Sequence, residues 1–181
     1  MTASELLLHP VRLRIAHAVM DGVPVTASDL CTRLPDVSKA TVYRQLAVLT
    51  EGGLVEVVGE ERVRGAVERT YRIHPSRTSM TDDEVATMSI DDHHRGFAAA
   101  IAALLGEFDA YLAREGANPQ IDMVSYKQFS LWLSDEEKAA FIEEVILAIR
   151  SRMEHGPALD RRRHMLSTIL FPTDTPVDQA H

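Results

Sequence analysis

The side chains best placed to do chemistry lie in the stretch from Ser38 to Gly53. With 3.6 residues per helical turn, Tyr43 and Arg44 share one outward face with two alanines. Small residues let a helix approach a DNA major groove closely, and an arginine can make two hydrogen bonds to a guanine edge. The face therefore predicts base reading, although an ordinary solvated helix can carry the same residues. The residues of this stretch that we expect to contact DNA are Ser38, Lys39, Ala40, Thr41, Tyr43 and Arg44.

Two further arginines, Arg62 and Arg64, fall in a glycine-bounded segment, residues 59–65. The segment separates two stretches rich in β-branched residues, 54–58 and 67–73, so the pattern predicts a hairpin with the arginines at its tip. Arginines on a hairpin beside a DNA-reading helix are placed for phosphate or minor-groove contact. The alternative is an exposed loop in which neighbouring glutamates pair with the arginines.

Other clusters of polar or aromatic residues give weaker indications of a functional site. Asp91 and His94 lie three residues apart and could share a cation on a helix, but adjacent histidines point in different directions, so we predict no metal site. Three aromatic residues in one predicted strand, Tyr126, Phe129 and Trp132, are candidates for the wall of a small-molecule pocket or for plain core. The sequence contains no catalytic nucleophile–base–acid spacing and no phosphate-cradling glycine loop, so we predict neither an enzyme nor a bound cofactor.

The sequence also predicts the elements that position the outward face. Ser38 is a good helix N-cap, and Gly52 with Gly53 favours the left-handed exit of a helix end. A preceding helix is predicted from the capping-box spacing of Thr26 and Asp29 and stops at Pro35. Two short helices joined by so tight a turn form a helix-turn-helix.

The amino-acid sequences of these segments resemble those of a known family. The residues concerned are L-H-P-V-R-L-R-I, T-A-S-D-L, V-S-K-A-T-V-Y-R-Q-L-A-V-L-T-E-G-G-L-V and the hairpin R-G-A-V-E-R-T-Y-R-I. Over roughly residues 5–75 they resemble the winged helix-turn-helix of ArsR-type bacterial transcriptional regulators. The resemblance implies a homodimer that binds a pseudo-palindromic operator, commonly as a repressor. It also implies that Lys39, Thr41, Tyr43 and Arg44 lie on the groove-reading helix and Arg62 and Arg64 on the wing.

The chain departs from that family in two respects. Metal-sensing members place a cysteine pair in the helix before the recognition helix, and this sequence has only Cys31. The sensing of arsenic or cadmium is therefore not implied. The long C-terminal half is not part of the minimal family fold.

That half is predicted to alternate helix, strand, helix and strand. A helix through residues 97–112 carries apolar residues at steps of three and four, and a capping box at residues 134–137 opens another. Residues 121–133 and 163–171 have strand composition, so we expect these two strands to pair. In a dimeric regulator, the first of these helices commonly pairs with its symmetry mate.

Composition limits the remaining classes. Residues 1–77 carry ten lysines and arginines against nine acidic residues, whereas residues 78–181 carry nine against eighteen, so the N-terminal part is the better partner for a polyanion. No apolar run approaches the roughly 20 residues of a membrane span, and no signal-like segment opens the chain, so we expect a cytoplasmic protein without membrane contact.

We therefore expect a mainly α fold with a small β part. Residues 1–75 form a winged helix-turn-helix, residues 80–171 an α+β dimerisation or sensory domain, and residues 172–181 a flexible tail. The predicted function is a sequence-specific DNA-binding transcriptional regulator, a homodimeric repressor of an inverted-repeat operator. Two alternatives stay open: a winged-helix scaffold for protein interactions, and a sensor of a small-molecule effector acting through the C-terminal domain.

Overall fold

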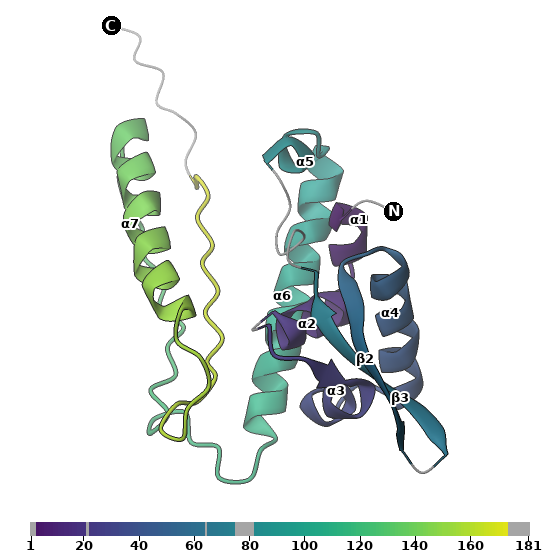
Figure 1. The fold of residues 1–181 in the computed structure, drawn as a ribbon. Coiled ribbons are helices and arrows are strands. Elements are labelled where there is room, and N and C mark those ends of the chain that lie inside the picture. Colours follow the sequence, from purple (N-terminus) through teal and green to yellow (C-terminus); the bar gives the residue numbers. More distant parts are fainter. Residues whose placement is uncertain (1–2, 21, 64, 75–81, 174–181) are drawn as a thin grey trace, which may run out of the picture. The chain divides into compact units, whose positions relative to one another are not determined.

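The computed structural model describes residues 3–20, 22–63, 65–74 and 82–173 of the 181-residue chain. Its elements are α1 (Ala3–Leu7), α2 (Pro10–Val19), β1 (Val25–Thr26), α3 (Ala27–Arg33), α4 (Lys39–Glu51), β2 (Val55–Val63), β3 (Ala66–Ile73), α5 (Asp82–Ala86), α6 (Ile90–Leu112) and α7 (Asp135–Met153) (Figure 1). The chain divides into two compact units, Met1–Tyr126 and Lys127–His181. No described helix is both long enough and apolar enough to cross a membrane.

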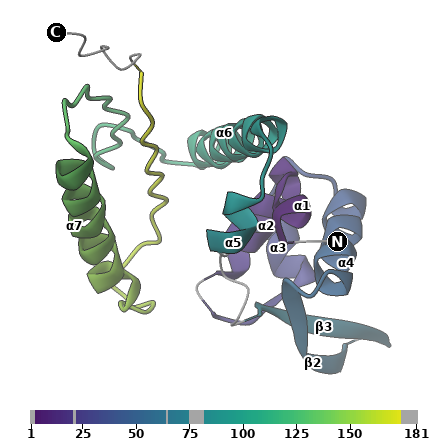
Figure 2. The same cartoon turned by 90° about the horizontal axis from the view of Figure 1, so that it is seen from above.

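The core of the first unit lies between the four N-terminal helices and the sheet. Its largest members have almost no exposed surface and come from all four helices and from the sheet; they include Leu6, Ile15, Leu30, Leu46, Leu49 and Val55. Burying aliphatic side chains of this size stabilises each by about 1.5–3 kcal/mol. The hairpin of β2 and β3 is anchored at this core, and its tip extends beyond the helices in both views (Figures 1 and 2).

Helix α4 begins and ends where its sequence predicts. The Ser38 hydroxyl accepts a hydrogen bond from the amide of Thr41 at 3.2 Å, which satisfies one of the free donors of the first turn. Gly53 follows the helix with a φ of 71°, a conformation that favours glycine. Val42, Leu46 and Leu49, which lie at i, i+4 and i+7 on the opposite side of the helix, are all buried. Their burial fixes which face of α4 remains outside.

The sheet is antiparallel and has the strand order β1-β3-β2. β2 continues through the segment expected to be the hairpin tip and ends at Val63, with a register shift between Val57 and Gly59. The two-residue strand β1, which periodicity did not predict, pairs with Tyr71 and Thr70 of β3. This arrangement, a helix-turn-helix followed by a two-stranded wing, is a winged helix with α+β composition.

Within the first unit, helix α6 packs against α2 through its small residues. Ala99, Ala103 and Ala110 are buried on this side, and the capping box of Ser89 and Asp92 begins the helix. The unit therefore continues to Tyr126, past the domain boundary expected at residues 75–80. All of that expected boundary lies outside the described residues.

The second unit differs from its prediction. Helix α7 begins at the predicted capping box of Ser134 and Glu137. The strands expected at residues 121–133 and 163–171 are wrong, since neither segment is a strand in the structure. β-Branched and aromatic composition favours a strand only when a partner supplies the ladder hydrogen bonds and a face to pack on, and no described residue from 127 to 173 is buried. Of the tail expected at 172–181, residues 174–181 lie outside the described residues.

Candidate nucleic-acid interface

The candidate interface begins with the turn that joins α3 to α4. The capping box of Thr26 and Asp29 starts α3, and its hydrogen bonds lower the pKa of Asp29. The chain turns after Leu34, where the amide of Val37 donates to the carbonyl of Leu34 at 3.0 Å. The turn is short and internally bonded, so the two helices hold a fixed angle and α4 is presented at the surface.

The outward face of α4 is arranged as expected. Lys39, Ala40, Arg44 and Ala47 are exposed, and Tyr43 is 54% exposed despite its large ring. Lys39 and Arg44 have no ion pair within the described part of the chain. Two unpaired cations and a phenol therefore project between small residues, which is the surface a major groove accommodates.

Ser38 and Thr41 are placed differently from their neighbours. The Ser38 hydroxyl is used in the cap, and it donates to the Thr41 hydroxyl at 2.9 Å. Thr41 is partly buried, and its hydroxyl lies at the N-terminal end of the helix. A hydroxyl and free amides at a helix N-terminus suit a phosphate oxygen better than a base edge.

Two residues of α2 and its N-cap, which the sequence did not single out, lie beside this face. The guanidinium of Arg12 donates to the carbonyls of Leu6 and Glu5 and, at 3.4 Å, to the side chain of Gln45 on α4. His9 accepts from the amide of Val11, and its pKa is lowered by burial and by the charges of Arg12 and Arg44. The guanidinium groups of Arg12 and Arg44 and the imidazole of His9 therefore gather at one edge of α4. Their contacts span distant parts of the sequence, so no local pattern could have found them.

The wing carries one of its two predicted arginines in the described residues. Arg62 lies on β2 opposite Val67, is exposed and forms no ion pair in the described part of the chain. The neighbouring Glu60 pairs with Arg69 at 2.8 Å instead, so among the described residues Arg62 is not held by the glutamates of the alternative reading. Arg64 lies outside the described residues.

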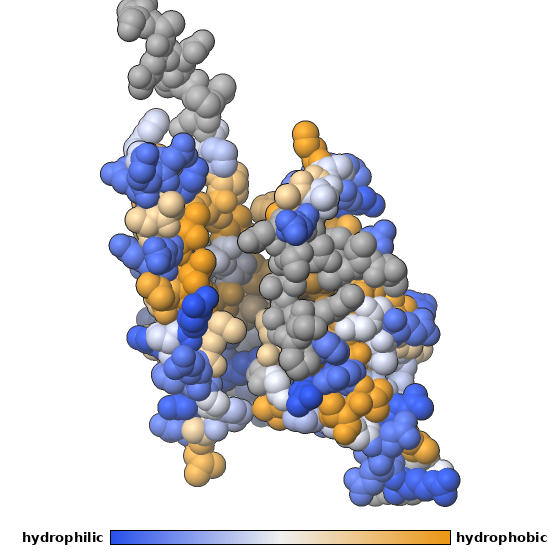
Figure 3. Space-filling model, turned by 45° about the horizontal axis from the view of Figure 1, so that its top comes forward, coloured by the Kyte–Doolittle hydropathy of each residue, from blue (hydrophilic) through white to orange (hydrophobic). Residues whose placement is uncertain are grey.

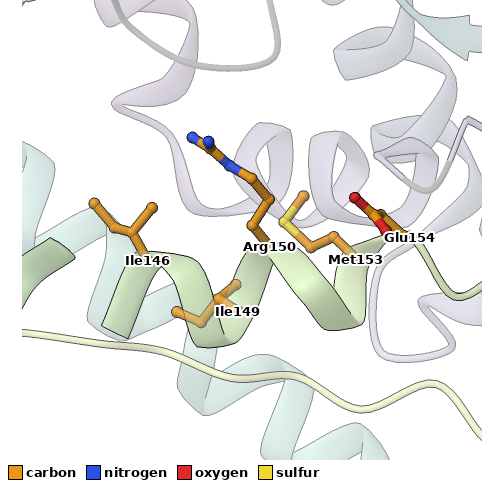
Figure 4. A pocket seen from close by; sticks show the side chains of 5 residues that line it. All are labelled: Ile146, Ile149, Arg150, Met153 and Glu154. Atoms are coloured by element: carbon orange, nitrogen blue, oxygen red, sulfur yellow. The ribbon is translucent and has the colours of Figure 1, made fainter. Parts of the chain in front are cut away.

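The structure places the other candidate clusters as follows. Tyr126, Phe129 and Trp132 are 80%, 77% and 85% exposed on a segment without regular structure. A pocket on α7 is lined by residues from its C-terminal half, namely Ile146, Ile149, Arg150, Met153 and Glu154 (Figure 4). It includes none of the three aromatics. Asp91 and Asp92 both pair with Arg95, and Asp92 also caps α6.

Comparison with protein families agrees with the first unit. Residues 7–58 match the model of a helix-turn-helix domain family, which covers α2, α3 and α4. A comparison with curated proteins finds no match. Among solved structures, the chain is similar to a protein with a GntR superfamily winged-helix-turn-helix domain from Halomicrobium mukohataei, with 18% identity and a TM-score of 0.35. That similarity covers 76% of this chain and 89% of the other, and its low TM-score carries no inference about function.

The class of protein follows from the fold, the exposed face and the domain match. The chain contains a helix-turn-helix domain, and this domain supports a DNA-binding regulator. The matched family is general, so the ArsR-type subfamily stays a prediction.

Proposed function

We propose that this protein is a sequence-specific transcriptional regulator that binds an inverted-repeat operator as a homodimer and represses transcription. An ArsR-type bacterial origin and a cytoplasmic location belong to the same proposal. The observation that supports it most is the outward face of α4, on which Tyr43 and Arg44 project between Ala40 and Ala47. In this proposal Lys39, Tyr43 and Arg44 read bases, and Thr41, Arg62 and Arg64 hold phosphates.

The homodimer is supported by the second face of α6. Large apolar side chains remain exposed on the side opposite the buried alanines, among them Phe97, Ile101, Leu105 and Leu112. A two-fold axis through such a face would relate two copies of α4 that bind two half-sites of opposite orientation. Half-sites would then lie about one helical turn of DNA, or a multiple of it, apart.

The test is selection of bound fragments from genomic duplex DNA by the purified chain at about 150 mM salt. We expect enrichment of one inverted repeat. Arg44→Ala should lose the preference at one base pair per half-site, at a cost of about 1–3 kcal/mol, because its two hydrogen bonds to a base edge disappear. Arg95→Ala is the matched control, since it removes one positive charge from α6, where the guanidinium pairs with Asp91 and Asp92.

Equal losses on the selected and on random duplex would contradict base reading by Arg44. A folded protein that enriches no sequence and is not retained on heparin at low salt would overturn the proposal. Such a protein would fit the interaction-scaffold alternative.

A further inference from the structure

Among the described residues of the first unit, Arg14 is the charged residue that is buried, with a side chain only 4% exposed. Its two terminal nitrogens donate to both carboxylate oxygens of Asp36, Nη1 to Oδ2 at 2.6 Å and Nη2 to Oδ1 at 2.8 Å. Its Nε donates to Oε1 of Glu107 at 3.2 Å. One planar group thus donates from both terminal nitrogens to one carboxylate and from Nε to another, a geometry that lysine cannot reproduce.

These two carboxylates belong to elements with different roles. Asp36 lies in the turn of the helix-turn-helix, two residues before Ser38, the N-cap of α4. Glu107 lies on α6, the long helix that packs on α2. Arg14 itself comes from the middle of α2. A single side chain therefore connects the body of α6 to the start of the helix that carries the candidate base-reading residues.

Space for this connection depends on a glycine of α6. A Cβ atom at Gly106 would lie 2.8 Å from Nη1 and 3.0 Å from Cζ of Arg14. Contacts that short do not occur, so any side chain at this position would push the guanidinium or the helix away. The close approach of α6 and the pairing of Arg14 with Asp36 are therefore parts of one arrangement.

We propose that Arg14 is a positioning residue that couples the placement of α6 to the orientation of α4 through Asp36 and Glu107. A buried guanidinium is costly to leave partly unpaired. A movement of α6 that draws Glu107 away therefore shifts the guanidinium, weakens its hydrogen bonds to Asp36 and loosens the turn. The coupling gives α6 control over the affinity for DNA. The DNA part of this inference rests on the proposed function, whereas the coupling between α6 and the turn does not.

The experiment compares Glu107→Gln with Asp109→Asn in the full chain. Both substitutions remove one negative charge from the same turn of α6, but Asp109 is exposed and lies away from Arg14. The first readout is amide hydrogen exchange without DNA. We expect the amides of residues 37–42 to exchange about 3- to 10-fold faster in Glu107→Gln and to be unchanged in Asp109→Asn.

The second readout is the ratio of affinities for the selected operator and for a random duplex. We expect Glu107→Gln to lower this ratio by about 3- to 10-fold, with Asp109→Asn unchanged. A role limited to stability would lower the folded fraction and leave the ratio intact. Arg14→Lys should lower the ratio as well, because an ammonium keeps the charge but loses the fork.

Two results would overturn the coupling. One is exchange at residues 37–42 that matches the Asp109→Asn control, and the other is faster exchange spread evenly over the first unit. Localised acceleration in a chain whose wild type shows no sequence preference would support the coupling and contradict the proposed function, so the two failures are distinguishable.

Discussion

Arginines of the wing differ in what already holds them. Arg69 pairs with Glu60 and Arg72 with Glu56, each at 2.8 Å, whereas Arg62 has no such partner in the described part of the chain. A guanidinium without an internal partner gives up less when it binds a phosphate, since no ion pair must be broken. Arg62 is therefore expected to contribute more to phosphate binding than Arg69 or Arg72, and the sequence alone does not give this order.

Substituting both predicted wing arginines tests their contact with phosphate. Arg62→Ala together with Arg64→Ala should lower the slope of log affinity against log salt by about 2, since each phosphate contact releases about one counterion. Titration of a labelled duplex over a range of salt concentrations measures the slope. Arg69→Ala is the matched control, because its guanidinium is engaged by Glu60, and its slope should change less. An unchanged slope in the double variant would remove the wing from the interface.

The charge of Asp36 should make stability depend on pH. Its pKa lies below the ordinary value of 3.8, chiefly because Arg14 donates hydrogen bonds to the carboxylate, with burial acting in the opposite direction. A carboxylate with a lowered folded-state pKa stabilises the fold above its unfolded pKa, and that stability is lost as the pH falls through the folded value. Asp36→Asn should therefore be less stable than wild type near neutral pH, and the difference should shrink below pH 3.8.

Urea unfolding of both proteins near neutral pH and at about pH 3 measures this difference. A gap in unfolding free energy that stays constant over that interval would show that the ionised carboxylate is not the stabilising form.

The outward face of α4 was predictable from the sequence, whereas the role of Arg14 was not. By sequence alone, a charged residue at position 14 is typical of a solvated helix face. Its partners lie 22 and 93 residues away in the sequence. No local spacing relates three such positions, so only the packing of α6 on α2 reveals why a charged side chain is buried there.

At the scale of single elements, α4 was predictable because its signals are local. A cap at Ser38, apolar residues at i, i+4 and i+7 and a glycine pair at the end are read within sixteen consecutive residues, and each has the predicted role in the structure. The strands predicted at residues 121–133 and 163–171 depended on a distant partner, which the structure does not provide. β1 was missed for the complementary reason, because two residues carry no periodicity and pair only with β3.

The cap of α4 should contribute measurably to stability. Ser38→Ala is expected to lower the free energy of unfolding by about 0.5–2 kcal/mol, because the amide of Thr41 loses its acceptor. Loosening of the first turn should also weaken DNA binding through Lys39 and Thr41. Circular dichroism during urea unfolding measures the stability. Ser28→Ala, at an exposed position of α3, is the control, and an equal change in both variants would argue against a capping role.

At the scale of the whole molecule, α6 has two different faces. Its small residues are buried against α2, and its large apolar residues, which periodicity predicted as the packing stripe, lie on the opposite side, about 180° away on a helix with 100° per residue. The helix is amphipathic as its sequence predicted, and the pairing of its apolar stripe with a symmetry mate stays a prediction. In Figure 3, hydrophobic side chains of the second unit are also open to solvent.

The exposed face of α6 should set the oligomeric state. Leu105, which is 58% exposed, lies near its middle, so Leu105→Asp is expected to convert a dimer into a monomer by placing a charge in an apolar contact. Light scattering after size exclusion should give wild type twice the 20.1 kDa of one chain. Ala102→Asp, on the flank of the same helix, should leave the mass unchanged. A wild-type mass of one chain would contradict this interface.

The second unit has a consequence for the lifetime of the protein. Residues 124–134 and 161–173 carry no regular structure, and no described residue from 127 to 173 is buried. Proteases bind extended chain with an open backbone, so these two segments should be cut first. Whatever shields them would then set the half-life of the chain, and abundance in the cell would depend on the same association that the apolar surface favours.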